Sequence, residues 1–202
     1  NGGGIWNQGA VVYMNNCTIS GNVSGQQAAG FYSIDSGGAR SISRISNTTI
    51  SDNDNTRSNT KRSGGGAYIR AGSDAVFTNC TFTGNKAGYG GAIAGHGTGA
   101  LPATALCISC TFTNNSANDG GGALFAYNNY ADVVARNSIV SGNSGPADSG
   151  DMGVLAGVDA SHVRAFTSVA GGQLLDNAGG AVGGWTFSAS TMLGEFGFHA
   201  GG

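Results

Sequence analysis

The sequence predicts an all-β fold, a right-handed parallel β-helix (a solenoid) with about 30 residues per coil. Three observations predict it: a polar and apolar motif that recurs at nearly constant spacing, a glycine-rich motif that recurs with it, and the lack of any helical period in the apolar residues. A segment that recurs at a fixed spacing is one structural unit that stacks on its neighbours.

The first motif reads [N/S]-x-x-[I/F/V]-[S/T]-x-N and ends on an asparagine. Its final residues are separated by 31, 32, 30 and 28 positions, which sets the length of one coil. We expect this asparagine at a corner, where its amide can bond to the coils on either side. The copies are NCTISGN, NTTISDN, NCTFTGN, SCTFTNN and NSIVSGN, which end at Asn22, Asn53, Asn85, Asn115 and Asn143.

The second motif is a small residue and a glycine followed by apolar residues. It shares the spacing of the first motif and predicts a third side of each coil. Glycine suits a backbone that takes a positive φ or passes close to a neighbouring coil. The copies are Gly3-Gly4-Ile5, Ala29-Gly30-Phe31, Gly65-Gly66-Ala67, Gly90-Gly91-Ala92-Ile93 and Gly121-Gly122-Ala123-Leu124.

Alignment on the final asparagine places like residues in columns. Offsets of −10 and −8 differ by two, as on one face of a strand, and so do −5 and −3, whereas the step between the pairs breaks the alternation and predicts a bend. We therefore expect Phe82 and Phe112 to stack in adjacent coils. The inward columns hold Ile19, Ile50, Phe82, Phe112 and Val140 at −3, Cys17, Thr48, Cys80, Cys110 and Ser138 at −5, and Met14, Ile45, Phe77, Cys107 and Ala135 at −8.

Composition narrows the class of protein. Charged residues make up 10% of the 202 residues and the net charge is −2, so the chain carries no electrostatic footprint for nucleic acid. The 38 glycines and the modest supply of large apolar residues suit a thin core whose segments cover one another. No apolar run is long enough for a transmembrane helix.

We predict one domain in two parts. Residues 1–145 form regular coils, and residues 146–202, which stay glycine-rich but lose the spacing, form irregular coils or a terminal cover of the same solenoid. The chain starts inside a repeat, so we expect it to be a fragment flanked by further coils of a longer chain.

Two copies carry a family resemblance. FTGN with GGAI (residues 82–85 and 90–93) and FTNN with GGAL (residues 112–115 and 121–124) resemble the F-x-x-N and G-G-A-[I/L] signatures of polymorphic outer membrane protein repeats. The resemblance covers residues 1 to about 145, with departures at Ile19, Ile50 and Ala29. It implies an exported, adhesin-like protein at the cell surface or outside the cell, and it implies no active site.

The four cysteines fall in inward columns, where a free thiol packs as a small apolar group. We expect buried thiols. Two alternatives stay open: a disulfide between Cys80 and Cys110, because adjacent coils bring their Cα atoms within range, and a metal site at Cys107-x-x-Cys110, which lacks a second pair of ligands. The sequence predicts no metal site and no cofactor.

Gly95-His96-Gly97 is similar to the G-H-G element of polygalacturonases, which share the predicted fold and hydrolyse acidic polysaccharides. Such hydrolysis needs two carboxyl groups. The chain has no Asp-Asp doublet, no Asn-Thr-Asp and no Arg-x-Lys after this element, and Arg70 is the nearest cation. We interpret His96 as a solvated side chain in a turn and identify no catalytic residue.

The segment from Asp52 to Arg62 holds an acidic pair, Asp52 and Asp54, and a small basic cluster. It lacks the glycine and the closing glutamate of a calcium loop, and its few cations do not make a nucleic-acid surface. We interpret it as a solvated insertion.

Recognition is expected in loops that the repeat does not constrain, here residues 54–63, 94–103 and 125–132. The third offers aromatic rings with amide neighbours, a combination that suits sugars, although tyrosines packed on the outside of the rod would give the same pattern. The predicted contact residues for a glycan or a surface protein are Tyr127, Asn128, Asn129 and Tyr130. The sequence thus favours a non-enzymatic secreted or cell-surface binding or spacer module, with a carbohydrate-active enzyme (polysaccharide lyase or hydrolase) as the alternative.

Overall fold

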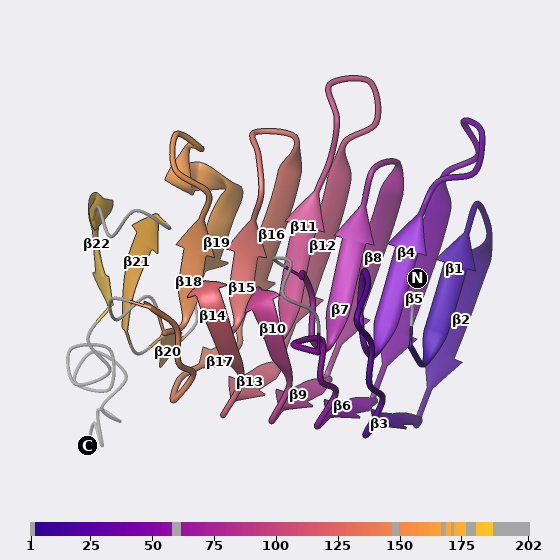
Figure 1. Cartoon of the computed structure of the whole chain (residues 1–202), viewed down its shortest axis with the longest axis horizontal. Helices are drawn as coiled ribbons and strands as arrows, with labels where there is room; N and C mark the ends of the chain where they lie inside the picture. Colours follow the sequence, from indigo (N-terminus) through magenta and orange to yellow (C-terminus); the bar gives the residue numbers. More distant parts are fainter. Residues whose placement is uncertain are drawn as a thin grey trace, which may run out of the picture.

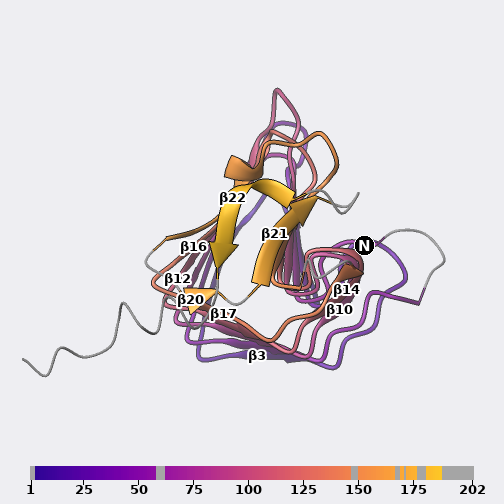
Figure 2. The same cartoon turned by 90° about the vertical axis from the view of Figure 1, so that its left-hand side faces the viewer.

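Each repeat folds into one coil of a right-handed solenoid, and equivalent strands of successive coils pair in parallel (Figure 1). The structure, a computed structural model, describes residues 3–57, 62–146, 150–166, 169–170, 172–176 and 181–187. Viewed along the solenoid, three strand columns enclose a triangular core (Figure 2). The predicted all-β solenoid with coils about 30 residues apart is confirmed.

Three long sheets run the length of the solenoid, and we number them by their order within one coil. Sheet 1 contains β1 (Ile5–Gln8), β4 (Phe31–Ile34), β7 (Ala67–Arg70), β11 (Ile93–His96), β15 (Leu124–Ala126), β18 (Met152–Val154), β21 (Gly172–Asp176) and β22 (Ala181–Phe187). Sheet 2 contains β2 (Val11–Asn15), β5 (Ser41–Ser46), β8 (Ser73–Thr78), β12 (Ala103–Ile108), β16 (Ala131–Arg136) and β19 (Val163–Phe166). Sheet 3 contains β3 (Thr18–Ser20), β6 (Thr49–Ser51), β9 (Thr81–Thr83), β13 (Thr111–Thr113), β17 (Ile139–Val140) and β20 (Val169–Ala170).

The remaining elements are short. A small parallel sheet pairs β10 (Lys86–Tyr89) with β14 (Ser116–Gly120), and the short helix η2 (Ala160–His162) precedes β19. β21 and β22 pair antiparallel, unlike the other strands of sheet 1. The predicted change of character after residue 145 stays a prediction, while β18, β19 and β20 continue the three sheets beyond it.

The core follows the predicted columns. In sheet 3, Ile19, Ile50, Phe82, Phe112 and Val140 occupy one register position in successive strands, and each is at most 5% exposed. The rings of Phe82 and Phe112 stack with centroids 5.0 Å apart and planes 14° apart. Phe77 from sheet 2 meets Phe82 edge-on at 5.2 Å. The predicted stacking of Phe82 on Phe112 is confirmed.

The final asparagines of the first motif form a ladder along one corner, as predicted. The Nδ2 of each donates to the Oδ1 of the next, from Asn22 to Asn53, Asn85, Asn115 and Asn143 in turn, over 2.8–2.9 Å. Each Oδ1 also accepts from the backbone N–H of the preceding asparagine. The ladder continues onto Asp151, whose carboxylate accepts from the backbone N–H and the Nδ2 of Asn143.

The residue before each ladder asparagine turns the chain with a positive φ. Glycine, asparagine and aspartate are the residues that tolerate this conformation, and only these three fill the column. Asp52 therefore lies at a corner of the coil, where its φ of 55° serves the turn. The column is Gly21, Asp52, Gly84, Asn114 and Gly142.

Three of the four thiols, those of Cys17, Cys80 and Cys110, replace hydroxyl groups at the corner between sheets 2 and 3, whereas Cys107 lies within β12. Cys17, Cys80, Cys107 and Cys110 are free thiols, of which Cys17 is partly exposed and the others are buried. The Sγ atoms of Cys80 and Cys110 each donate to the carbonyl two residues earlier, as do the hydroxyl groups of Thr48 and Ser138 in the same column. The expectation of buried thiols holds for three of the four, and their role as donors was not predicted.

Candidate functional site

Side chains of sheet 1 that point away from the core, together with residues of the segments that pack on them, form a second cluster on the outside of the solenoid. Because strand residues alternate between faces, the neighbours of the core residues Ile69, Ile93 and Leu124 point outward. We call this group the outer cluster. It comprises Tyr32, Ser63, Tyr68, Arg70, Tyr89, His96, Phe125 and Tyr127.

The pair β10 and β14 covers part of this face (Figure 2). Tyr89, the last residue of β10, is 1% exposed and packs on Phe125 with ring centroids 4.7 Å apart. The end of β14 can lie this close to Phe125 because residue 120 is a glycine. A Cβ at Gly120 would lie 2.9 Å from the Phe125 ring. The outer cluster is thus a small second core between sheet 1 and the strand pair.

Tyr127 lies at the centre of the outer cluster. Its ring contacts Tyr68, Tyr89, His96 and Phe125, with ring centroids 5.0–6.4 Å apart. Its hydroxyl accepts a hydrogen bond of 2.8 Å from the Ser63 hydroxyl. Burial, with smaller contributions from Tyr68, Tyr89 and Asp119, raises the pKa of Tyr127. The phenol therefore stays neutral and acts as a hydrogen-bonding group.

His96 lies between two tyrosines of the outer cluster. Its Nδ1 is 3.0 Å from the hydroxyl of Tyr68, and its ring stacks on Tyr127 with centroids 5.2 Å apart. Burial raises the pKa of Tyr68 to about 12, so the Tyr68 phenol keeps its proton and can donate it to Nδ1 of a neutral imidazole. The interpretation of His96 as a solvated turn residue is wrong, because the residue ends β11 and is half-buried by its neighbours.

Protonation of His96 is expected to destabilise the fold. Burial, with a contribution from Arg70, lowers the pKa of His96 from its usual 6.5. The unfolded chain therefore binds this proton at higher pH than the folded protein does, and stability should fall as the pH decreases below 6.5. An NMR titration of the His96 ring checks this, with Arg70→Gln expected to raise the pKa. Titration of His96 at or above 6.5 would contradict the packing described for this ring.

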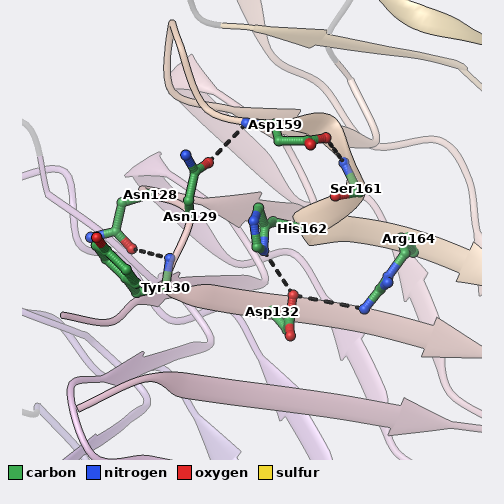
Figure 3. A network of polar contacts seen from close by, with 8 residues as sticks. All are labelled: Asn128, Asn129, Tyr130, Asp132, Asp159, Ser161, His162 and Arg164. Atoms are coloured by element: carbon green, nitrogen blue, oxygen red, sulfur yellow. Dashed lines mark hydrogen bonds and ion pairs between the residues drawn. The ribbon is translucent and has the colours of Figure 1, made fainter. Parts of the chain in front are cut away.

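Residues Asn128 to Tyr130 form the loop between β15 and β16 (Figure 3). The Nδ2 of Asn128 donates to the carbonyl of Gly97 in the preceding coil, and the Oδ1 of Asn129 accepts from the backbone N–H of Asp159 in the following coil. Tyr130 is 51% exposed, and its backbone N–H donates to Asn128 Oδ1. The two amides thus tie three successive loops together.

A charged network lies beside this loop, on the outer face of sheet 2 (Figure 3). The Asp132 carboxylate is 2.9 Å from His162 Nδ1 and 3.7 Å from the Arg164 guanidinium. Asp159 accepts from the backbone N–H of Ser161, which lowers the pKa of its carboxyl group. This network joins β16 to the segment before β19.

The structure divides the predicted contact residues between two environments. Tyr127 packs in the outer cluster, whereas Asn128, Asn129 and Tyr130 lie on the loop ridge. The second and third predicted loops were too long, because residues 94–96 belong to β11, residue 103 to β12, residues 125–126 to β15 and residues 131–132 to β16. The connections between these strands span residues 97–102 and 127–130. Residues 58–61 of the first predicted loop lie outside the described residues. Sequence reasoning missed Tyr68 and Tyr89, although an alignment on the glycine motif places His96 and Tyr127 at equivalent positions. The pairing of β7 with β11 adds Arg70 to this column.

The polar groups of the outer cluster are engaged in hydrogen bonds within it, which limits the chemistry that the cluster can perform. Arg70 donates to the Tyr32 hydroxyl at 3.3 Å, His96 Nδ1 lies 3.0 Å from the Tyr68 hydroxyl, and the Tyr127 hydroxyl accepts from Ser63. Asp119 is the carboxylate whose charge acts on Tyr127, whereas hydrolysis of a glycosidic bond requires two carboxyl groups. Within the described ranges no three His, Cys, Asp or Glu side chains are grouped so that they could hold a metal ion. Asp54 instead accepts from the backbone N–H and the hydroxyl of Thr56.

Comparison with known proteins identifies the architecture. The family model described as the right-handed β-helix region matches residues 1–164. Searches of curated proteins and of solved structures found no match. In the described part of the chain no helix has the length and apolar character needed to cross a membrane.

Proposed function

Because this chain belongs to the right-handed β-helix family, we propose that it is a non-enzymatic secreted or cell-surface protein that acts as a binding or spacer module. The observation that carries the proposal is the internal use of the outer cluster. Tyr127, His96 and Arg70 each bond to another member of the cluster, so the groups best suited to catalysis serve packing. The stacked sheets and the asparagine ladder supply a rigid support.

The proposed contact surface for a glycan or a surface protein is the loop ridge at Asn128, Asn129 and Tyr130, with Tyr127 beneath it. Tyr130 offers an exposed ring, and Asn128 and Asn129 fix the loop through hydrogen bonds to the coils on either side. A loop that is already ordered loses little entropy when a partner binds. The resemblance to polymorphic outer membrane protein repeats supports an extracellular location and an adhesin-like role.

One observation favours the enzyme alternative. Arg70, His96 and Tyr127 come from three successive coils and lie on one face, each partly exposed. An arginine can neutralise the carboxylate of an acidic sugar while a histidine or tyrosine moves a proton, which is the requirement for a polysaccharide lyase. Against it stand the bond between His96 and Tyr68 and the stacking of Tyr127 on the His96 ring.

Binding to an array of glycans tests the contact surface. We expect wild type to bind and both Tyr130→Ala and the double variant Tyr127→Ala/Tyr130→Ala to lose at least about tenfold in affinity, because aromatic anchors dominate such surfaces. Asn118→Ala, an exposed residue of β14, serves as the control. Equal binding by wild type and both tyrosine variants would place the site elsewhere, and no binding by wild type would favour the spacer role.

Incubation with acidic polysaccharides such as pectin tests the absence of catalysis. We expect no unsaturated or reducing-end product from wild type, and no change in His96→Ala or Asp119→Asn. Product formation that His96→Ala abolishes, with the variant shown to be folded by circular dichroism, would establish the enzyme alternative.

A further inference from the structure

A groove of about 250 Å³ lies on the outer face of sheet 2, across β2, β5 and β8. It is formed by two columns of outward side chains. Tyr13, Arg44 and Val76 are register partners in the three strands, and Asn15, Ser46 and Thr78 are partners two residues further along. Met14 and Ile45 complete the lining. The groove lies on a different sheet from the outer cluster.

The groove combines an exposed ring with an unpaired positive charge. Tyr13 is 78% exposed, the largest value among the exposed large apolar side chains of the described residues. Arg44 donates to the carbonyl of Ser43 and forms no ion pair with any described residue. The lining contains no acidic side chain. The groove therefore carries the positive charge of Arg44, which an anion can reach.

The neighbouring arginine shows the contrast. Arg40 reaches Asp74 on β8 through its Nε and one terminal nitrogen, at 3.0 and 2.8 Å. The Asp74 carboxylate, which lies one outward position before Val76, is thereby neutralised by Arg40. Two arginines four residues apart thus differ in one respect, because Arg40 has a carboxylate partner and Arg44 has none among the described residues.

Further donors line the other side of the groove. The Oδ1 of Asn15 accepts hydrogen bonds from the Ser46 hydroxyl and from Asn47 Nδ2. The Nδ2 of Asn15 takes no part in these two bonds. The Nδ2 of Asn15 and the hydroxyl of Thr78 make no hydrogen bond with any described side chain. An aromatic face, an amide donor, a hydroxyl group and a guanidinium are the groups that recognise a polar ring carrying an anion.

We propose that this groove binds a single sugar ring that carries a carboxylate or a sulfate. The apolar face of the ring packs on Tyr13 and Val76, the anionic group binds the Arg44 guanidinium, and the ring hydroxyls bond to Asn15 and Thr78. The volume lies just below the roughly 300 Å³ at which drug-sized sites begin, which suits one ring rather than a long chain segment. The site is independent of the loop ridge proposed above.

The test uses the full chain labelled with ¹⁵N and three probes, glucuronic acid, glucose 6-sulfate and neutral glucose, followed by amide chemical shifts. We expect at least one anionic sugar to shift the amides of residues 13–15, 44–46 and 76–78, with a dissociation constant on the order of a millimolar for a ligand of about a dozen heavy atoms. Glucose should bind at least about tenfold more weakly, because it lacks the charge-assisted bond. The tighter anionic probe identifies the carboxylate or the sulfate as the recognised group.

Two arginine variants provide a comparison, since each removes one positive charge and the two positions lie four residues apart. Arg44→Gln should weaken binding of the anionic sugar at least about tenfold, whereas Arg40→Gln, which leaves the Asp74 carboxylate unpaired near the groove, should weaken it by no more than about threefold. Tyr13→Ala should weaken it at least about fivefold through loss of the aromatic face. The double variant Tyr127→Ala/Tyr130→Ala should bind as wild type does, so failure of this site and failure of the loop ridge are distinguishable.

Three results would overturn the proposal. One is the absence of shifts in these residues with either anionic sugar up to about ten times the expected dissociation constant. Another is equal weakening by Arg40→Gln and Arg44→Gln, which would show general attraction of anions to the sheet. The third is binding of sodium acetate or sodium sulfate with the same affinity as the anionic sugars and with shifts in the same residues. That result would mean that the sugar ring contributes nothing to binding.

Discussion

Replacement of Phe112 by alanine is expected to lower the free energy of unfolding by about 3–5 kcal/mol. The Phe112 side chain is fully buried in sheet 3, and its ring stacks on Phe82 in the preceding coil. Removal of the ring loses its apolar burial and leaves a cavity that the neighbouring coils cannot fill, because their backbones are held by the sheet hydrogen bonds. The backbone pairing of β13 with β9 at Thr111 and Thr81 should remain.

Equilibrium denaturation with urea measures the effect. Ile139→Ala is the matched control, because Ile139 lies in the next strand of the same sheet but is 49% exposed, and its loss should stay within about 0.5 kcal/mol. A loss below about 1 kcal/mol for Phe112→Ala would mean that the ring is not a core residue. A loss as large for Ile139→Ala would mean that the two faces of the strand have been exchanged.

The repeat made the core predictable. One alignment on the final asparagine placed Ile50, Phe82 and Phe112 in one column, and parallel pairing of identical units then stacks each residue on its equivalent. The same logic predicted the asparagine ladder, since an amide that recurs at a corner has both a donor and an acceptor to offer its neighbours. In a solenoid, local sequence and long-range contact carry the same period, so the sequence reveals both.

The outer cluster was harder to predict because it depends on segments outside the aligned motif. Residues 86–89 and 116–120 carry no apolar alternation, and they become strands by pairing with each other across coils. Their fold over sheet 1 buries Tyr89 and Phe125 and turns His96 from an expected turn residue into a packed one. The glycine motif did contain a usable signal, namely the equivalent positions of His96 and Tyr127.

The thiols illustrate a different limit. Their column was predicted to face inward, and an inward cysteine was interpreted as an apolar group. The hydroxyl residues Thr48 and Ser138 in the same column were the sign of a polar role. A side chain at this corner can bond to the carbonyl two residues earlier, and a hydroxyl or a thiol can do so. Residue type alone does not separate packing from hydrogen bonding when a column mixes both.

Replacement of Asn85 by alanine is expected to cost about 3–5 kcal/mol, although it removes only a small polar group. Asn85 is fully buried, and its Nδ2 donates to Asn115 Oδ1 and to the carbonyl of Ile50. Its Oδ1 accepts from the backbone N–H and the Nδ2 of Asn53. Alanine leaves the Asn53 N–H and the Ile50 carbonyl without these partners, and each orphaned buried group costs about 1–3 kcal/mol.

An aspartate at the same position separates the donor role from the acceptor role. Asn85→Asp keeps an oxygen for Asn53, but its second oxygen faces two acceptors, Asn115 Oδ1 and the Ile50 carbonyl. The buried carboxylate is therefore disfavoured and its pKa is raised above the unfolded value of about 3.9. Because a raised folded pKa stabilises below the unfolded value and loses that stability as the pH rises, Asn85→Asp should become less stable between about pH 4 and neutral pH, whereas Asn85→Ala should show no added pH dependence.

Urea denaturation at several pH values measures both variants against Asn118→Ala, an exposed asparagine of β14 whose loss should stay within about 0.5 kcal/mol. If Asn85→Ala loses less than about 1 kcal/mol, solvent has replaced the amide and the ladder contributes little to stability. If Asn85→Asp shows the same pH profile as wild type, the carboxylate does not face acceptors. The ladder runs from Asn22 to Asp151 with a single direction of donation, so a break at Asn85 affects the coils on both sides and should also lower the cooperativity of unfolding.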